Sequence, residues 1–218
     1  MTRFFGLTTF LVVVSVTLSA QVESLRSLAR GMGGAATTHV NREIPRWPLD
    51  EMVRSADLIV RGRITQQTAF LNDDESLIFT DSWISPSEIF KSAPTIDPAI
   101  PIVLRILGGK VRLDGLMMTT TTDVDQVLET GDECFFFLSA AESTPSLRAR
   151  PGVYDSVTGP FGVFPIGYGS LDRKPVGTSP RGESGAAAFA ATIRQLVAAD
   201  KRHFPRQAMV FVVSPPYV

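Results

Sequence analysis

The sequence predicts a mainly β fold, a small barrel or sandwich of about five to seven strands, followed by a C-terminal amphipathic helix. Segments rich in β-branched and aromatic residues recur between residues 47 and 167, with turn signals between them. Residues 134–138 form a continuous apolar run, which is typical of a strand buried on both faces. After residue 183 the apolar residues recur at helical spacing instead.

Composition limits the classes of function. The chain has 218 residues, 44% hydrophobic and 20% charged, which is ordinary for a globular protein and leaves room for one domain. Its formal net charge is -1, so we expect no nucleic-acid partner, because neutralising phosphates needs clustered positive charge. One cysteine and two histidines cannot supply a complete structural zinc site or an intramolecular disulfide.

Residues 1–20 have the layout of a secretory signal peptide. A basic residue, Arg3, precedes an apolar run from Phe4 to Leu18, and the small residues Ser19 and Ala20 follow. We expect cleavage after Ala20, with an uncleaved anchor as the alternative. The cleavage region lacks a cysteine for lipid attachment. The mature chain is therefore expected to be secreted or periplasmic, without membrane contact after cleavage.

The first part of the mature chain divides at residue 46. Residues 21–46 are rich in glycine, alanine and threonine without periodicity, so we expect a flexible lead-in. The barrel domain is expected over residues 47–167, opening with a short helix near Leu49. Residues 58–65 alternate with period two and predict a strand, in which Gly62 marks a bulge or a close backbone approach. A second strand over residues 77–84 is expected to break at Pro86.

Further strands are expected over residues 100–107 and 109–118, joined by a bend at Gly108, and over residues 152–156 and 161–166. The run at residues 134–138 should be the central strand, with Cys134 as a small buried apolar group rather than a nucleophile.

The C-terminal part is expected to contain a linker over residues 168–183, a helix over residues 184–202 and a tail over residues 203–218. Four residues share one face of the helix, which we expect to dock on the barrel: Phe189, Ile193, Leu196 and Val197. Ser184 is the expected N-cap. The apolar tail is either an edge strand or disordered.

The segment from Pro48 to about Ile166 resembles a domain of exported bacterial proteins without assigned function. The resemblance rests on residues 56–64, Thr80, residues 88–91, Gly108 with Gly109, and residues 131–138. The order of these features is also similar to netrin-like and metalloproteinase-inhibitor modules, which implies an oligonucleotide/oligosaccharide-binding (OB)-like five-stranded barrel. Ser92 replaces a glycine of the bacterial pattern, and the cysteines of the inhibitor modules are missing.

One motif suggests catalysis. Ser184 lies between glycines in a segment similar to the serine region of chymotrypsin-like proteases, and His39 precedes it in the matching order. Such chemistry needs the histidine to be held against the serine hydroxyl. The alternatives are an N-cap for Ser184 and a lead-in position for His39, and these we prefer.

Other motifs lack the features of a cofactor or metal site, so we expect neither. Gly108-Gly109-Lys110 lacks the spacer and the hydroxyl residue of a phosphate loop. The acidic groups at residues 73–75 and 123–125 lack the loop of a calcium site. Basic residues in the C-terminal stretch are expected on a solvated face rather than on a lipid surface.

Three functional hypotheses follow. The favoured one is an exported, non-enzymatic binding module that contacts a protein or another macromolecule. The second is a serine hydrolase built on Ser184, and the third is a structural component of the envelope whose apolar tail joins a partner.

Overall fold

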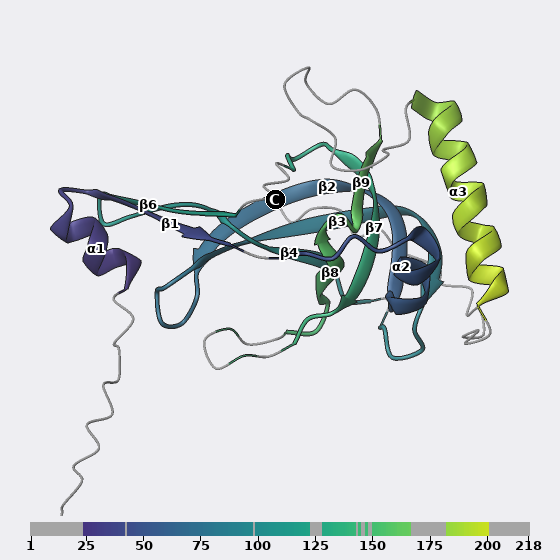
Figure 1. Cartoon of the computed structure of the whole chain (residues 1–218), viewed down its shortest axis with the longest axis horizontal. Coiled ribbons are helices and arrows are strands. Elements are labelled where there is room, and N and C mark those ends of the chain that lie inside the picture. The colour runs from purple at the N-terminus through teal and green to yellow at the C-terminus, as the bar shows by residue number, and fades with distance from the viewer. Residues whose placement is uncertain are drawn as a thin grey trace, which may run out of the picture.

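The described part of the chain contains three helices and two β-sheets (Figure 1). The computed structural model describes residues 24–41, 43–97, 99–122, 128–142, 144, 147, 150–166 and 182–200. The helices are α1 (Leu25–Gly31), α2 (Leu49–Ser55) and α3 (Gly182–Ala199). The strands are β1 (Ala35–Val40), β2 (Leu58–Leu71), β3 (Ile78–Ser92), β4 (Ile102–Leu107), β5 (Gly109–Leu113), β6 (Leu116–Thr122), β7 (Glu133–Ala140), β8 (Val153–Pro160) and β9 (Val163–Ile166).

Five strands of the larger sheet pair in a closed ring. β2, β3 and β4 form an antiparallel meander, and β4 then pairs in parallel with β8. β8 pairs with β7, and β7 pairs antiparallel with β2, which closes the ring. β9 adds to β7 beyond the end of β8. The predicted mainly β fold with a C-terminal helix is confirmed.

β7 is buried on both faces, as its apolar run predicts. Cys134, Phe136 and Leu138 belong to the cluster inside the ring, where side chains of β2, β3, β4 and β8 meet them. Phe135 and Phe137 point to the other face and join a second cluster outside the ring. All five side chains are fully buried, since successive residues of a strand face opposite sides of the sheet.

Helices α2 and α3 cover the outer cluster. Phe189 of α3 lies edge-on to Phe135, with ring centroids 5.0 Å apart, and at the same distance from Phe164 of β9. Ile193 is fully buried, and Leu196 and Val197 pack against the same cluster. The apolar stripe of α3 therefore lies on the outer face of the ring, beside α2 (Figure 1).

Lys91 of β3 ties both helices to the ring. Its buried Nζ donates hydrogen bonds to the carbonyl oxygens of Val53, at 2.7 Å, and of Arg54, at 3.2 Å. Both carbonyls lie in the last turn of α2, where a cation also meets the negative end of the helix dipole. The same Nζ lies 3.4 Å from the Asp200 carboxylate, directly after α3.

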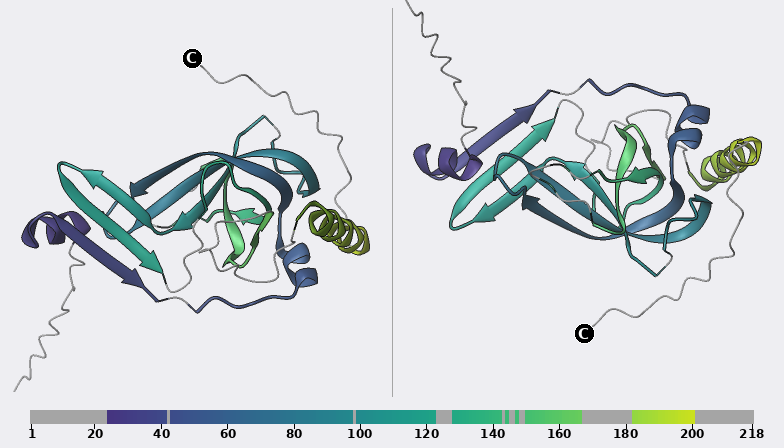
Figure 2. Two further views of the ribbon diagram at one scale, coloured as in Figure 1. Left: turned by 90° about the horizontal axis from the view of Figure 1, so that it is seen from above. Right: turned by 90° about the horizontal axis from the view of Figure 1, so that it is seen from below.

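The smaller sheet forms an arm at the end of the molecule opposite α3 (Figures 1 and 2). β5 and β6 form a hairpin, and β1 pairs with β6 in parallel. The prediction of a single strand over residues 109–118 is wrong, because the chain turns at Asp114 and Gly115, between β5 and β6. Both have positive φ, 54° and 79°, as a two-residue Asp-Gly hairpin turn requires.

The lead-in expected to be flexible over residues 21–46 contains regular structure. Ser24 caps α1 by accepting a hydrogen bond from the Ser27 amide, and Leu25 and Ala29 are buried. With Ala36 of β1 they form a third cluster, to which Ile78 and Met118 also belong. The pairing of β1 with a strand far along the chain orders this segment, and the local sequence carries no sign of that pairing.

β3 does not break at Pro86. The strand runs through this residue, and Pro86 lies opposite Gly62 where the register between β2 and β3 shifts. Such an irregularity tolerates a residue without an amide hydrogen. The close approach expected at Gly62 is confirmed, since a Cβ there would lie 2.7 Å from the Ser85 carbonyl oxygen and 2.8 Å from the Ile84 side chain.

Ser184 is not the N-cap of α3. The helix begins at Gly182, so Ser184 lies in its first turn and is exposed to solvent. The signal peptide expected over residues 1–20 and the tail expected over residues 203–218 lie outside the described residues. Within the described ranges, none of the helices combines the length and the apolar character that a membrane crossing requires.

The double-sided burial of β7 gives a first prediction. Phe135→Ala and Phe136→Ala should each lower the free energy of unfolding by about 3–5 kcal/mol, because each leaves a cavity in a different cluster. Denaturant unfolding measures the loss. Thr68→Ala, at an exposed position of β2, is the control and should change it by less than about 0.5 kcal/mol. A loss that small at Phe135 would place α3 off the ring.

A second prediction concerns the close approach at Gly62. Gly62→Ala should lower the free energy of unfolding by about 1–3 kcal/mol, because the added methyl group meets the backbone of β3. Gly31→Ala is the matched control: a Cβ at this last residue of α1 has no atom within 4 Å. Thermal and denaturant unfolding of both variants should show a loss only at Gly62, and equal stabilities would contradict the observed strand contact.

Candidate functional site

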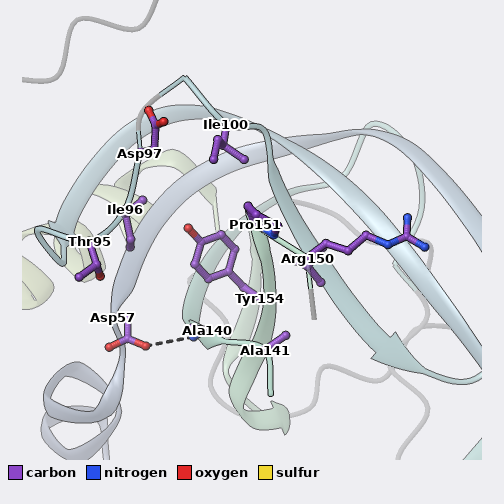
Figure 3. Close-up of a pocket in the computed structure, with 12 residues that line it drawn as sticks. Asp57, Thr95, Ile96, Asp97, Ile100, Ala140, Ala141, Arg150, Pro151 and Tyr154 are labelled. Carbon is purple, nitrogen blue, oxygen red and sulfur yellow. Dashed lines mark hydrogen bonds between the residues drawn. The ribbon is translucent and has the colours of Figure 1, made fainter. Parts of the chain in front are cut away.

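A pocket of about 280 Å³ opens at one end of the strand ring (Figure 3). The start of β2, the segment between β3 and β4, the end of β7 and the start of β8 surround it. The lining residues are Asp57, Thr95, Ile96, Asp97, Ile100, Ala140, Ala141, Arg150, Pro151, Gly152, Val153 and Tyr154. The pocket therefore depends on the ring closure that brings these four segments together.

Asp57 fixes one side of this pocket. Its amide donates to the Leu138 carbonyl oxygen and its own carbonyl accepts from the Ala93 amide, each at 2.8 Å. One carboxylate oxygen, Oδ2, accepts a hydrogen bond of 3.0 Å from the Ala140 amide (Figure 3). Asp57 thus joins β2 to the ends of β3 and β7, and its second carboxylate oxygen stays available to a ligand.

Tyr154 forms the floor of the pocket. Its side chain belongs to the cluster inside the ring and is only 6% exposed, while its hydroxyl points toward Ile96 and Asp97 (Figure 3). Burial raises the pKa of this phenol, and the negative charge of Asp57 adds to the rise. Tyr154 is therefore neutral at physiological pH, with a hydroxyl that can both donate and accept a hydrogen bond.

The rim of the pocket carries charges of both signs. One carboxylate oxygen of Asp97 accepts a hydrogen bond of 2.9 Å from the Ala99 amide. The guanidinium of Arg150 is directed away from Asp57 and Asp97 (Figure 3). Within the described part of the chain, no cationic side chain forms an ion pair with either aspartate.

The pocket has an acidic character on one side and an apolar character on the other. It combines an acidic side with apolar walls from Ile96, Ile100 and Pro151. Among the described residues, no group of three or more histidine, cysteine or acidic side chains is placed to hold a metal ion. The site can therefore offer hydrogen-bond acceptors, negative charge and apolar contact to a small ligand.

A second candidate surface lies on the arm. In the described ranges the exposed large apolar side chains are Met32, Leu113 and Met117, with 71%, 37% and 40% exposure. Leu113 and Met117 belong to the smaller sheet, and Met32 lies between α1 and β1. Met117 faces away from the buried Met118 and lies opposite Arg112. We call this solvent-exposed side of the smaller sheet the outer arm face. By register and alternation it consists of Ala35, Thr37, His39, Lys110, Arg112, Met117, Thr119 and Thr121.

The structure does not bring His39 and Ser184 together. His39 is on β1 in the arm, where its Nδ1 lies 2.9 Å from the Thr121 hydroxyl oxygen. Ser184 is on α3, at the opposite end of the molecule (Figures 1 and 2). The arrangement therefore lacks the contact that a histidine needs to activate this serine.

Cys134 and Gly108 have positions inside the fold. Cys134 is buried in the ring, and desolvation, with the nearby charges of Asp132 and Glu133, raises the pKa of its thiol far above the usual range. The thiol therefore remains protonated and unreactive. Gly108 lies between β4 and β5, as the expected bend requires, and has a φ of 117°.

The sequence alone does not identify the pocket residues as a site. Asp57 and Tyr154 are far apart in the chain, and each also has an ordinary place beside a strand. The available signals were a tyrosine within a strand and an aspartate directly before another strand. Neither signal identifies the other residue, because only ring closure brings them together.

Comparison of the chain with known protein families and with curated proteins gave no significant match. The two candidate surfaces therefore rest on the geometry of the chain itself.

The environment of Tyr154 gives a third prediction. Spectrophotometric titration should show a tyrosine that ionises above the ordinary value of 10.0, and Tyr154→Phe should remove that step. Asp57→Asn should lower the pKa of Tyr154, because it removes one of the causes of the shift. A proton held more tightly in the folded state stabilises it fully below about pH 10. That contribution should disappear as the pH rises through the pKa of folded Tyr154, and Tyr154→Phe should lack this loss.

Proposed function

We propose that this chain is an exported, non-enzymatic binding module that contacts a protein partner through the outer arm face. Export is proposed from the layout of residues 1–20, with a basic residue, an apolar run and a small-residue end. In this proposal the ring is a scaffold that carries two separate surfaces, the outer arm face and the pocket.

We further propose that the ring is a barrel of the OB type, related to the exported bacterial domain and to the netrin-like modules that the sequence resembles. The pairing order supports this proposal. Counted along the chain, the first three ring strands form a meander, the third pairs in parallel with the fifth, and the fourth pairs with both the fifth and the first. OB folds are five-stranded Greek-key barrels that bind ligands through strands and loops.

One observation carries the proposed function: Met117, one of the three large apolar side chains exposed among the described residues, lies on the outer arm face, and the other two, Met32 and Leu113, lie beside or within the same sheet. Apolar groups in water favour association, and methionine adapts its shape to different partners. Lys110 and Arg112 lie on the same face as Met117, on the neighbouring strand β5. Their positive charge favours a partner with acidic groups around an apolar contact.

Site-specific crosslinking tests this function as a fourth prediction. A photoreactive amino acid at Arg112, which lies opposite Met117, should yield a discrete crosslinked product in the exported fraction of the native host. Adding Met117→Ser should reduce the yield of the crosslinked product by about tenfold, because a methionine buried in an interface contributes enough binding free energy to change the affinity by about that factor.

The matched control places the same photoreactive group at Gln66, an exposed position of β2 outside the arm. This position should yield no comparable product. Equal products at both positions, or a product at Arg112 that Met117→Ser leaves unchanged, would contradict a specific contact through the outer arm face.

A further inference from the structure

The pocket at the end of the ring has two features that favour a positively charged ligand with N–H groups that can donate hydrogen bonds. Asp57 and Asp97 are both on its surface, and no described cationic side chain forms an ion pair with either. Arg150 also lines the pocket, but its guanidinium points away from both aspartates (Figure 3). Each carboxylate uses one oxygen for a backbone amide, Ala140 for Asp57 and Ala99 for Asp97. The negative charge of both groups is left to attract a cation from solution.

The second feature is the hydroxyl of Tyr154. The side chain is 6% exposed, lines the pocket and points its hydroxyl into it (Figure 3). Among the described residues, none forms a hydrogen bond with this hydroxyl. The hydroxyl is open to the pocket, where it can donate a hydrogen bond to a ligand or accept one from it.

The walls and the size of the pocket restrict the ligand further. Ile96, Ile100 and Pro151 provide apolar contact, and a pocket of about 280 Å³ is slightly smaller than the usual sites for drug-sized ligands, so it suits a small ligand. The ligand that matches both the negative charge and the apolar walls of the pocket is a short alkyl chain that carries one ammonium group. Its N–H groups would face Asp57 and the Tyr154 oxygen.

We propose that this pocket binds a small organic ammonium ion, with its charged nitrogen between Asp57 and the Tyr154 hydroxyl and its alkyl chain against Ile96 and Ile100. Asp97 supplies the second negative charge at the rim. A carboxylate ligand meets like charge from both aspartates, and an alcohol of the same shape lacks the charge that the aspartates attract. This site is separate from the outer arm face, so it does not depend on the proposed protein contact.

Binding of n-butylammonium to the whole protein tests the proposal. The ligand is titrated at pH 7 and constant ionic strength, and the methyl NMR signals of the isoleucines are followed. Saturable shifts should occur at Ile96 and Ile100, whereas Ile193, in the cluster beneath α3, should not move. Matched titrations use 1-butanol and butyrate, and each should bind at least about tenfold more weakly, as expected for the loss of a charge-assisted hydrogen bond.

Three substitutions identify the groups responsible. Asp57→Asn keeps an oxygen for the Ala140 amide but removes the charge, and it should raise the Kd for n-butylammonium about tenfold. Tyr154→Phe removes only the hydroxyl and should raise the Kd about threefold or more. Asp73→Asn makes the same change of charge in the exposed turn between β2 and β3, and should leave the Kd unchanged.

Thermal unfolding first establishes that each variant is folded. If Asp57→Asn fails to fold, Asp97→Asn replaces it, because Asp97 is exposed and its change should raise the Kd at least about threefold. Equal affinity for n-butylammonium and 1-butanol, shifts without saturation, or an unchanged Kd in the tested aspartate variant would each overturn the proposal. Retained ammonium binding with a failed arm crosslink would overturn the protein contact alone.

Discussion

The burial of β7 on both faces is the constraint on which the rest of the structure depends. Its inner side chains need a closed ring around them, and its outer phenylalanines need a cover. β2, β8 and β9 pair with the backbone of β7, while α2 and α3 shield Phe135 and Phe137 from water. Charges cannot enter this arrangement without partners, so Lys91 meets two carbonyl oxygens and Asp200 at its edge.

Local patterns in the sequence predicted what depends on one segment alone. The apolar run of β7, the apolar stripe of α3 and the close approach at Gly62 all follow from side-chain periodicity or from the lack of a side chain. The Asp114-Gly115 turn is equally local, but the prediction of one strand over residues 109–118 missed it. The predicted strand break at Pro86 is wrong, because the sheet accommodates this proline where the register with the opposite strand shifts.

Features that depend on distant pairing could not be predicted in this way. The order of β1 comes from β6, and the pocket exists only because the start of β2 and the start of β8 meet at one end of the ring. The proximity of Asp57 to Tyr154 is likewise a product of strand order. The candidate serine and histidine illustrate the reverse case: their order in the sequence suggested a pair, whereas the fold places β1, with His39, and α3, with Ser184, at opposite ends of the molecule.

The parallel pairing of β1 with β6 also bears on the order of folding. During synthesis β1 is made early, but β6, its only partner strand among the described residues, is complete only after Thr122 has been synthesised. The β5–β6 hairpin can form by itself through its short turn, whereas β1 must wait for a contact across a long stretch of chain. Until then its backbone amides and carbonyls are an open edge that neighbouring chains can extend. The arm of the nascent protein is therefore exposed to aggregation until β6 has been synthesised.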